Sequence, residues 1–146
     1  EILLAADTDP TISVGGILPT IGGNIRVGGS NLFVTEACEY TNSFLSFYPT
    51  MEVILNIEAD HLDFFKDIDD IRHSFRLFME KLPKDGILVI NGDIHNLSEL
   101  INGLDCEIIT VGHGESCELL IFHIMNLLRL PLTSQMQATL HLVTFS

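Results

Sequence analysis

The chain has 146 residues, and its 7 basic and 20 acidic side chains give a formal net charge of −13 with the histidines neutral. Apolar residues make up 47 % of it, so the chain can bury a hydrophobic core, which excludes a disordered acidic tail. A surface this acidic repels phosphate backbones and anionic lipid headgroups, so we expect no nucleic-acid partner and no membrane partner.

The cysteines and the apolar segments predict a cytoplasmic protein. Cys38, Cys106 and Cys117 are odd in number and widely spaced, unlike a disulfide framework or a zinc site. Cys38 is expected to be buried at the end of a strand. The N-terminal residues lack the basic and apolar regions of a signal peptide, and the apolar stretch 117–132 is too short and too interrupted to span a membrane.

The first half of the chain predicts three strands. The first covers 11–14 and precedes a series of glycine pairs, and the next two, at 31–35 and 51–57, are apolar and rich in β-branched residues. Each of the latter two runs into a polar cluster, at 36–39 and at 58–63 respectively. We therefore expect two buried strands that deliver acidic side chains at their carboxyl ends.

An amphipathic helix is predicted over 68–82, because apolar residues recur there mostly at steps of three and four. A strand at 86–90, a short helix at 94–101 and a strand at 106–111 follow. Strands that alternate with helices predict an α/β fold, with a mostly parallel sheet and flanking helices.

The composition changes after residue 114. Residues 117–146 hold one acid, Glu118, and one base, Arg129, so the residues before them carry the whole net charge. A helix near 118–128 and a strand near 138–145 are predicted. We interpret 1–114 as the α/β body and 115–146 as an atypical apolar tail, truncated or frame-shifted.

The polar residues after the second and third strands are the first candidate site. They are Glu36, Glu39, Glu58, Asp60, His61 and Asp63. Ligands of parallel α/β sheets bind beyond the carboxyl ends of the strands, and carboxylates with an imidazole suit Mg²⁺ or Mn²⁺. The alternative is that these are solvated acidic loops, with His61 capping a neighbouring turn.

The glycine series at 14–29 is the second candidate. Consecutive glycines let the backbone approach a ligand, and Asn24 and Arg26 could hydrogen-bond an anionic substrate. The series does not match a dinucleotide or phosphate-loop pattern. Tight turns between strands are the interpretation that we favour for these glycine pairs.

Four segments in order, 9–16, 22–26, 34–45 and 56–63, resemble the central domain of the Mur ligases. The resemblance extends over about residues 1–113, and its most specific parts are Glu36-Ala-Cys-Glu39 and Asn56-Ile-Glu-Ala-Asp-His-Leu-Asp63. It is strongest toward the branch of the family that adds alanine.

The resemblance implies an ATP-dependent ligase of peptidoglycan synthesis, which joins L-alanine to UDP-N-acetylmuramate through an acyl phosphate. Glu36 matches the carboxylate that holds the Mg²⁺ (or Mn²⁺) between the ATP phosphates, and His61 matches the ligand of a second Mg²⁺. These two are the implied catalytic and metal-binding residues. Asn24 matches a substrate-side position with Arg26 beside it, and Asn56 is assigned to the cofactor side.

The chain also departs from the family pattern. The family's Gly-Lys-Thr phosphate loop is expected upstream of residue 1, so 1–114 is interpreted as a partial central domain that is inactive alone. Residues 68–78 contain arginines but no lysine, which agrees with the alanine-adding branch. The alternatives are a Mur ligase that recycles murein peptide and a non-catalytic remnant that binds a partner. We also expect self-association through exposed apolar surface.

Overall fold

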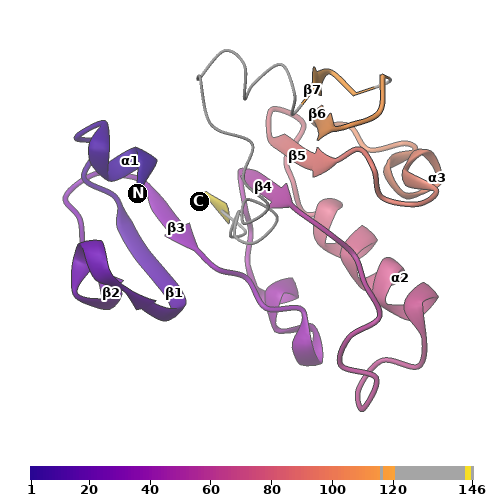
Figure 1. Cartoon of the computed structure of the whole chain (residues 1–146), viewed down its shortest axis with the longest axis horizontal. Coiled ribbons are helices and arrows are strands. Elements are labelled where there is room, and N and C mark those ends of the chain that lie inside the picture. The colour runs from indigo at the N-terminus through magenta and orange to yellow at the C-terminus, as the bar shows by residue number, and fades with distance from the viewer. Residues whose placement is uncertain (116, 121–143, 146) are drawn as a thin grey trace.

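The structure is a computed structural model, and it describes residues 1–115, 117–120 and 144–145. The strands of this part of the chain form one sheet in the order β2-β1-β3-β8-β4-β5-β6-β7 (Figure 1). The strands are β1 (Thr11–Leu18), β2 (Gly23–Arg26), β3 (Phe33–Thr35), β4 (Met51–Ile54), β5 (Ile87–Asn91), β6 (Glu107–Gly112), β7 (Leu119–Leu120) and β8 (Thr144–Phe145). The helices are α1 (Ile2–Ala5), α2 (Ile68–Met79) and α3 (Leu97–Ile101), with 3₁₀ segments η1 (Pro19–Ile21) and η2 (Tyr40–Ser46).

The sheet is mostly parallel, as predicted. Strands β4, β5, β6 and β7 pair in parallel, and so do β1 and β3. Strand β8 lies between β3 and β4 and is antiparallel to both, so β3 and β4 run in the same direction. Their carboxyl ends, which lead to Glu36 and to the 55–63 loop, therefore lie at the same edge of the sheet. The α/β class is confirmed.

Helix α2 forms where its pattern predicts, and it ends at Met79 rather than Leu82. The side chain of Asp67 accepts a hydrogen bond from the backbone N–H of Asp70 and caps the first turn. At the other end Lys81 and Leu82 donate to the carbonyls three residues earlier, at Phe78 and Met79. The chain tightens there into a turn that still brings Leu82 against the core.

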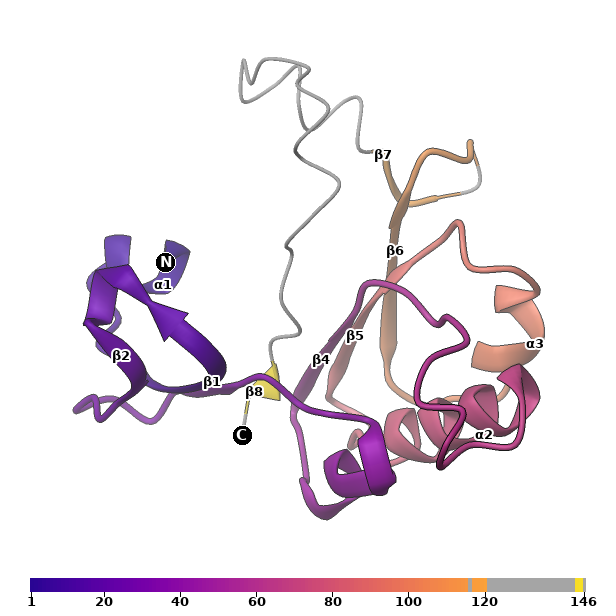
Figure 2. The same ribbon diagram turned by 60° about the horizontal axis from the view of Figure 1, so that its bottom comes forward.

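The hydrophobic core lies between β4–β5 and the helices. Figure 2 shows α2 and α3 on the same side of the strands. Phe44 of η2 stacks on Phe78 of α2, with ring centroids 4.6 Å apart, and meets Phe75 edge-on at 5.3 Å. The buried residues of this core are Ala37, Phe44, Ile54, Phe65, Ile71, Phe75, Phe78, Met79, Leu88, Ile90, Ile94 and Leu100. The segment that follows β3 is thus packed through aromatic rings against α2.

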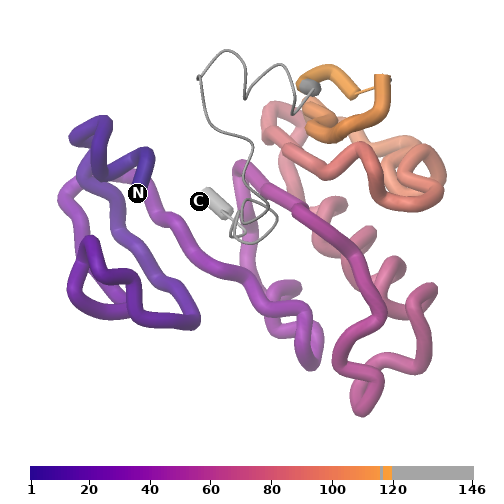
Figure 3. Tube along the Cα trace, in the orientation of Figure 1, coloured from indigo at the N-terminus to yellow at the C-terminus, as the bar shows by residue number. Residues whose placement is uncertain are grey.

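The β1–β2 hairpin stands apart from that core (Figure 3). Strand β1 continues four residues beyond the predicted 11–14 and passes through Gly15 and Gly16, so a tight turn at this pair was a wrong prediction. The connection from β1 to β2 turns at the second glycine pair, where Gly22 has a φ of +69°. The hairpin exposes apolar side chains, among them Ile17 at 82 %.

Three further predictions have different outcomes. Residues 119–120 form a strand where a helix was predicted, whereas 121–128 of that helix and 138–143 of the last strand lie outside the described residues. Residues 144–145 are in a strand, as predicted. Cys38 is exposed rather than buried, because β3 ends at Thr35 and the chain has left the sheet there.

In the described ranges, none of the helices combines the length and the apolar composition that crossing a membrane requires.

Candidate functional site

Glu36 is held at the carboxyl end of β3 by the neighbouring strand. The backbone N–H of Gly15, in β1, donates a 2.8 Å hydrogen bond to Oε2 of Glu36. A β-carbon at position 15 would lie 3.3 Å from the same oxygen, which is tighter than ordinary contact. The absence of a side chain at Gly15 therefore lets the carboxylate rest on the backbone of β1.

The loop after β4 fixes the backbone of His61. His61 has a φ of +50°, in the left-handed region that non-glycine residues seldom adopt. Its N–H donates to Oδ1 of Asp60 at 2.6 Å, and its carbonyl accepts from the N–H groups of Phe64 and Phe65 at 2.9 Å each. Hydrogen bonds on both sides thus compensate for the unfavourable conformation.

The imidazole of His61 faces residues that follow β3. Its Nε2 lies 3.5 Å from Oε1 of Glu39, and its ring centroid lies 4.6 Å from that of Tyr40. The Tyr40 hydroxyl in turn donates to Oδ2 of Asp63 at 2.8 Å, and this partnership with a carboxylate raises the pKa of Tyr40. The two polar clusters that the sequence placed after separate strands are therefore in contact.

A cleft of about 330 Å³ opens beside this contact. It is lined by Ala37, Glu39, Leu55, Asn56, Glu58, Ala59, Asp60, Ile71 and Phe75. Asn56 is exposed; its amide donates to Oε1 of Glu58 and its carbonyl oxygen accepts from the N–H of Ile57 at 3.0 Å. The lining of the cleft combines buried apolar residues, such as Ile71 and Phe75, with acidic side chains, which suits a ligand that carries or is accompanied by positive charge.

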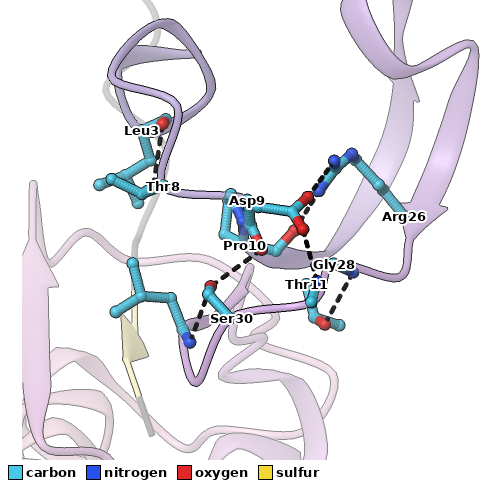
Figure 4. A network of polar contacts seen from close by, with 10 residues as sticks. Leu3, Thr8, Asp9, Pro10, Thr11, Arg26, Gly28 and Ser30 are labelled. Carbon is cyan, nitrogen blue, oxygen red and sulfur yellow. Dashed lines mark hydrogen bonds and ion pairs between the residues drawn. The ribbon is translucent and has the colours of Figure 1, made fainter.

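Arg26 is engaged in a network around the turn before β1 (Figure 4). Its guanidinium forms an ion pair with Asp9 and donates to the carbonyl of Pro10 at 2.7 Å. The second oxygen of Asp9 accepts from the N–H of Gly29 at 2.7 Å, and the hydrogen bond from Arg26 lowers the pKa of Asp9. Arg26 thus ties β2 to the start of β1. Asn24, on the same strand, is exposed.

The structure brings together some predicted site residues and not others. Glu39 and Asp60 each lie within 4 Å of the His61 imidazole, and Glu36 accepts a hydrogen bond from the backbone of β1. In the part of the chain that the structure describes, no three His, Cys, Asp or Glu side chains are arranged to hold one metal ion. Tyr40 was not among the predicted site residues, and Gly15 was included only as a member of the glycine series at 14–29. Tyr40 directly follows the Glu-Ala-Cys-Glu motif, and this adjacency was the available signal.

The donor set at this edge nevertheless fits Mg²⁺ or Mn²⁺. Carboxylate oxygens with one imidazole are ligands of the hard cations, which use few protein ligands and keep several waters. The 3.5 Å between Glu39 Oε1 and His61 Nε2 is close to the roughly 3 Å that separates two adjacent ligands of an octahedral ion at about 2.1 Å. Because waters complete the coordination of these cations, a binding site does not need three protein ligands.

Comparison with known proteins places the chain in a family. The profile described as Mur ligase middle domain matches residues 18–128. Over 112 residues the chain is 72 % identical to the UDP-N-acetylmuramate--L-alanine ligase of Lachnospira eligens, covering 77 % of this chain and 24 % of that protein. It is 60 % identical over 117 residues to the ligase of the same name from Lachnoclostridium phytofermentans, covering 80 % and 25 %. The chain thus spans about a quarter of the length of these curated relatives.

Two solved structures share the fold. The UDP-N-acetylmuramate:L-alanyl-gamma-D-glutamyl-meso-diaminopimelate ligase from Neisseria meningitides superposes with a TM-score of 0.68 at 26 % identity, over 75 % of this chain and 39 % of that one. The UDP-N-acetylmuramate-alanine ligase from Thermotoga maritima gives 0.61 at 24 % identity, over 76 % and 24 %. The matched profile covers most of the described sheet together with the loops that carry Glu36 and His61. This chain belongs to the Mur ligase middle domain family.

Proposed function

We propose that this chain forms the metal- and substrate-binding part of an ATP-dependent ligase that joins L-alanine to UDP-N-acetylmuramate. The observation that carries the proposal is the 72 % identity to the Lachnospira eligens ligase of that name. Identity at this level, in a segment that contains both polar clusters, favours the same reaction over a non-catalytic remnant. The three cysteines, free of disulfides, agree with a cytoplasmic location.

Glu36 and His61 are the residues that would hold Mg²⁺ or Mn²⁺, each as a ligand of one of two cations. A bound cation would neutralise phosphate charge, which a chain of net charge −13 would otherwise repel. Gly15 keeps the Glu36 carboxylate at the sheet edge through its N–H. The hydrogen bonds to the backbone of His61 keep that residue beside Glu39. Asn56, on the rim of the acidic cleft, is assigned to the cofactor side.

Asn24 and Arg26 are proposed for the substrate side. Asn24 is exposed on β2 and is free to meet an anionic ligand. The guanidinium of Arg26 binds Asp9 and the carbonyl of Pro10. We propose that these contacts fix the position of β2 and therefore of Asn24.

Metal titration of the 146-residue chain tests the metal assignment. Mn²⁺ added to the labelled protein should broaden the NMR signals of the Gly15 amide and the His61 ring before those of other residues, because a paramagnetic ion acts on nearby nuclei. Glu36→Gln should remove the effect at Gly15, and His61→Ala should lower Mn²⁺ affinity. Glu107→Gln and His73→Ala, two exposed residues on β6 and α2, are the matched controls. Unchanged Mn²⁺ binding in folded Glu36→Gln and His61→Ala would refute the metal assignment.

A chimera tests the ligase reaction. The matching segment of the Lachnospira eligens ligase is replaced by residues of this chain, and ligation of L-alanine to UDP-N-acetylmuramate is measured. We expect the chimera to be active and Glu36→Gln to lower its rate by about 100-fold or more. An inactive chimera that folds and binds UDP-N-acetylmuramate normally would count against the proposed reaction.

A murein-peptide ligase is the second candidate. The Neisseria structure, whose name specifies a tripeptide substrate, superposes somewhat better than the Thermotoga alanine ligase. Assaying the chimera with L-alanine and with L-alanyl-γ-D-glutamyl-meso-diaminopimelate separates the two reactions. The high identity to the alanine-adding relatives leads us to expect alanine as the better substrate.

A further inference from the structure

Tyr40 touches both polar clusters of the site at once. Its ring lies against the imidazole of His61, with centroids 4.6 Å apart and planes inclined by 34°. Its hydroxyl donates to Oδ2 of Asp63 at 2.8 Å. Asp63 lies two residues beyond His61, so one side chain from the β3 side is attached to the His61 loop at two points.

The segment that carries Tyr40 is itself anchored. The hydroxyl of Ser43 donates to the carbonyl of Cys38 at 2.8 Å, and the N–H of Phe44 donates to the same carbonyl at 2.9 Å. Phe44 is fully buried between the rings of α2. Tyr40 is therefore held by a turn that is fixed to the hydrophobic core.

The Tyr40 ring also contacts a series of aromatic residues that leads to the core. The ring meets Phe64 edge-on at 6.1 Å, and Phe64 meets Phe65 edge-on at 4.9 Å. Phe65 is 2 % exposed and belongs to the core. The position of the His61 ring is thus connected through Tyr40 and Phe64 to a buried residue.

A role for Tyr40 in the core does not account for this arrangement. The residue is 38 % exposed and contributes little buried apolar area. Without it, the His61 imidazole would lose its ring contact and keep only its approaches to Glu39, at 3.5 Å, and to Asp60, at 3.9 Å. Both distances are longer than an ordinary N–H···O hydrogen bond, so these carboxylates by themselves fix the orientation of the ring only weakly.

We propose that Tyr40 is a positioning residue, which holds the His61 imidazole in the orientation that binds the cation, while Asp63 holds Tyr40. This inference rests on the proposed function, in which His61 is a metal ligand. Tyr40 acts through His61 and makes no contact with the cation. Residues that orient a metal-binding histidine commonly change metal affinity by 10–100-fold when they are replaced.

The test compares Mn²⁺ binding at His61 in variants of the full 146-residue chain. Tyr40→Leu removes the ring and the hydroxyl and should weaken the affinity read from broadening of the His61 ring signal by about 10-fold. Tyr40→Phe keeps the ring and should restore most of the affinity. Tyr48→Leu is the matched control, because Tyr48 is 78 % exposed and its ring lies under the ammonium of Lys81, 4.4 Å away.

A second readout follows the imidazole itself without metal. Nuclear Overhauser contacts between the two rings, and the ring-current shift of the His61 protons, should be present in the wild type and absent in Tyr40→Leu. The thermal midpoint of Tyr40→Leu should stay near that of Tyr48→Leu. If Tyr40 had only a structural role, its replacement would instead lower the thermal midpoint and leave the metal affinity of the folded protein unchanged.

The outcomes separate the two proposals. If Mn²⁺ reaches His61 with equal affinity in the wild type and in Tyr40→Leu, the positioning role is overturned and the metal role of His61 stands. If the folded wild type shows no Mn²⁺ effect at His61, the proposed metal function is overturned, and the positioning role with it.

Discussion

The backbone N–H of Gly15 and the carboxylate of Glu36 are joined by a 2.8 Å hydrogen bond that spans 21 residues of sequence. The bond exists because β1 and β3 pair in parallel, with Ser13 opposite Thr35, so Gly15, which is still in β1, lies beside Glu36, which directly follows β3. A glycine of β1 is in this way part of the site at the end of β3.

Gly15→Ala should weaken metal binding without unfolding the protein. The new β-carbon would lie 3.3 Å from Oε2 of Glu36 and displace the carboxylate by a few tenths of an ångström. We expect Mn²⁺ affinity to fall severalfold, measured by the titration described above. Gly16→Ala is the matched control, because a β-carbon there meets nothing within 4 Å. Equal affinities in the two variants would show that the Gly15 contact does not orient Glu36.

Glu52 should make the stability of the fold depend on pH. Its side chain is fully buried on β4, neither carboxylate oxygen has a hydrogen-bond partner among the residues that the structure describes, and burial raises its pKa from 4.5 to about 8. Because the folded-state pKa is the higher one, the unfolded chain releases this proton first as pH rises. The contribution of Glu52 to the free energy of unfolding should therefore fall between about pH 4.5 and pH 8 and stay level above that range.

Glu52→Gln should remove this pH dependence. The shift corresponds to a difference on the order of 5 kcal/mol between the two ends of the range, so the variant should be more stable than the wild type at pH 8 and similar to it at pH 4.5. Urea unfolding at a series of pH values measures this, with the exposed Glu107→Gln as the control. Parallel stability curves for wild type and Glu52→Gln would contradict the prediction.

Replacing Arg26 should loosen the hairpin. Arg26→Ala removes the ion pair to Asp9 and the bond to Pro10, and it frees the carboxylate that accepts from Gly29. Hydrogen exchange of the Gly29 amide should quicken by roughly fivefold, the equivalent of one hydrogen bond of about 1 kcal/mol. The same loosening should occur in the wild type as pH falls through the lowered pKa of Asp9.

Arg72→Ala serves as its control. Arg72 donates to the carbonyls of His95 and Asn96, beside α3, so its loss should leave the Gly29 amide unchanged. If both variants quicken exchange at Gly29 equally, the effect is global and the local network is not its cause.

Removal of the α2 cap should destabilise the whole sheet. Asp67→Ala leaves the N–H of Asp70 without its 3.0 Å partner and removes a negative charge from the helix N-terminus. We expect a loss of about 1 kcal/mol in the free energy of unfolding, measured with urea. Asp85→Ala, an exposed aspartate before β5, should change stability by much less.

The sequence alone was sufficient for α2 and for strands β3 to β6, but it did not predict β2, and it predicted a helix where β7 lies. The three- and four-residue recurrence over Ile68–Met79 predicted α2, and the apolar β-branched runs predicted β3 to β6, because these elements bury one face and their pattern is local. The resemblance in the Glu36 and His61 motifs led to the family, which the comparisons confirm. Glycine pairs were less informative, because Gly15 and Gly16 are compatible with a strand as well as with a turn.

Only the tertiary structure decided which side chains meet. Nothing in the order of residues states that Tyr40 lies against His61, that Gly15 binds Glu36, or that Arg26 is engaged by Asp9. These contacts follow from strand pairing and from the left-handed backbone at His61, which depend on residues distant in sequence. Likewise, nothing in the sequence distinguishes Glu52 from the other acidic residues. Its burial in the folded protein removes its carboxylate from water and raises its pKa.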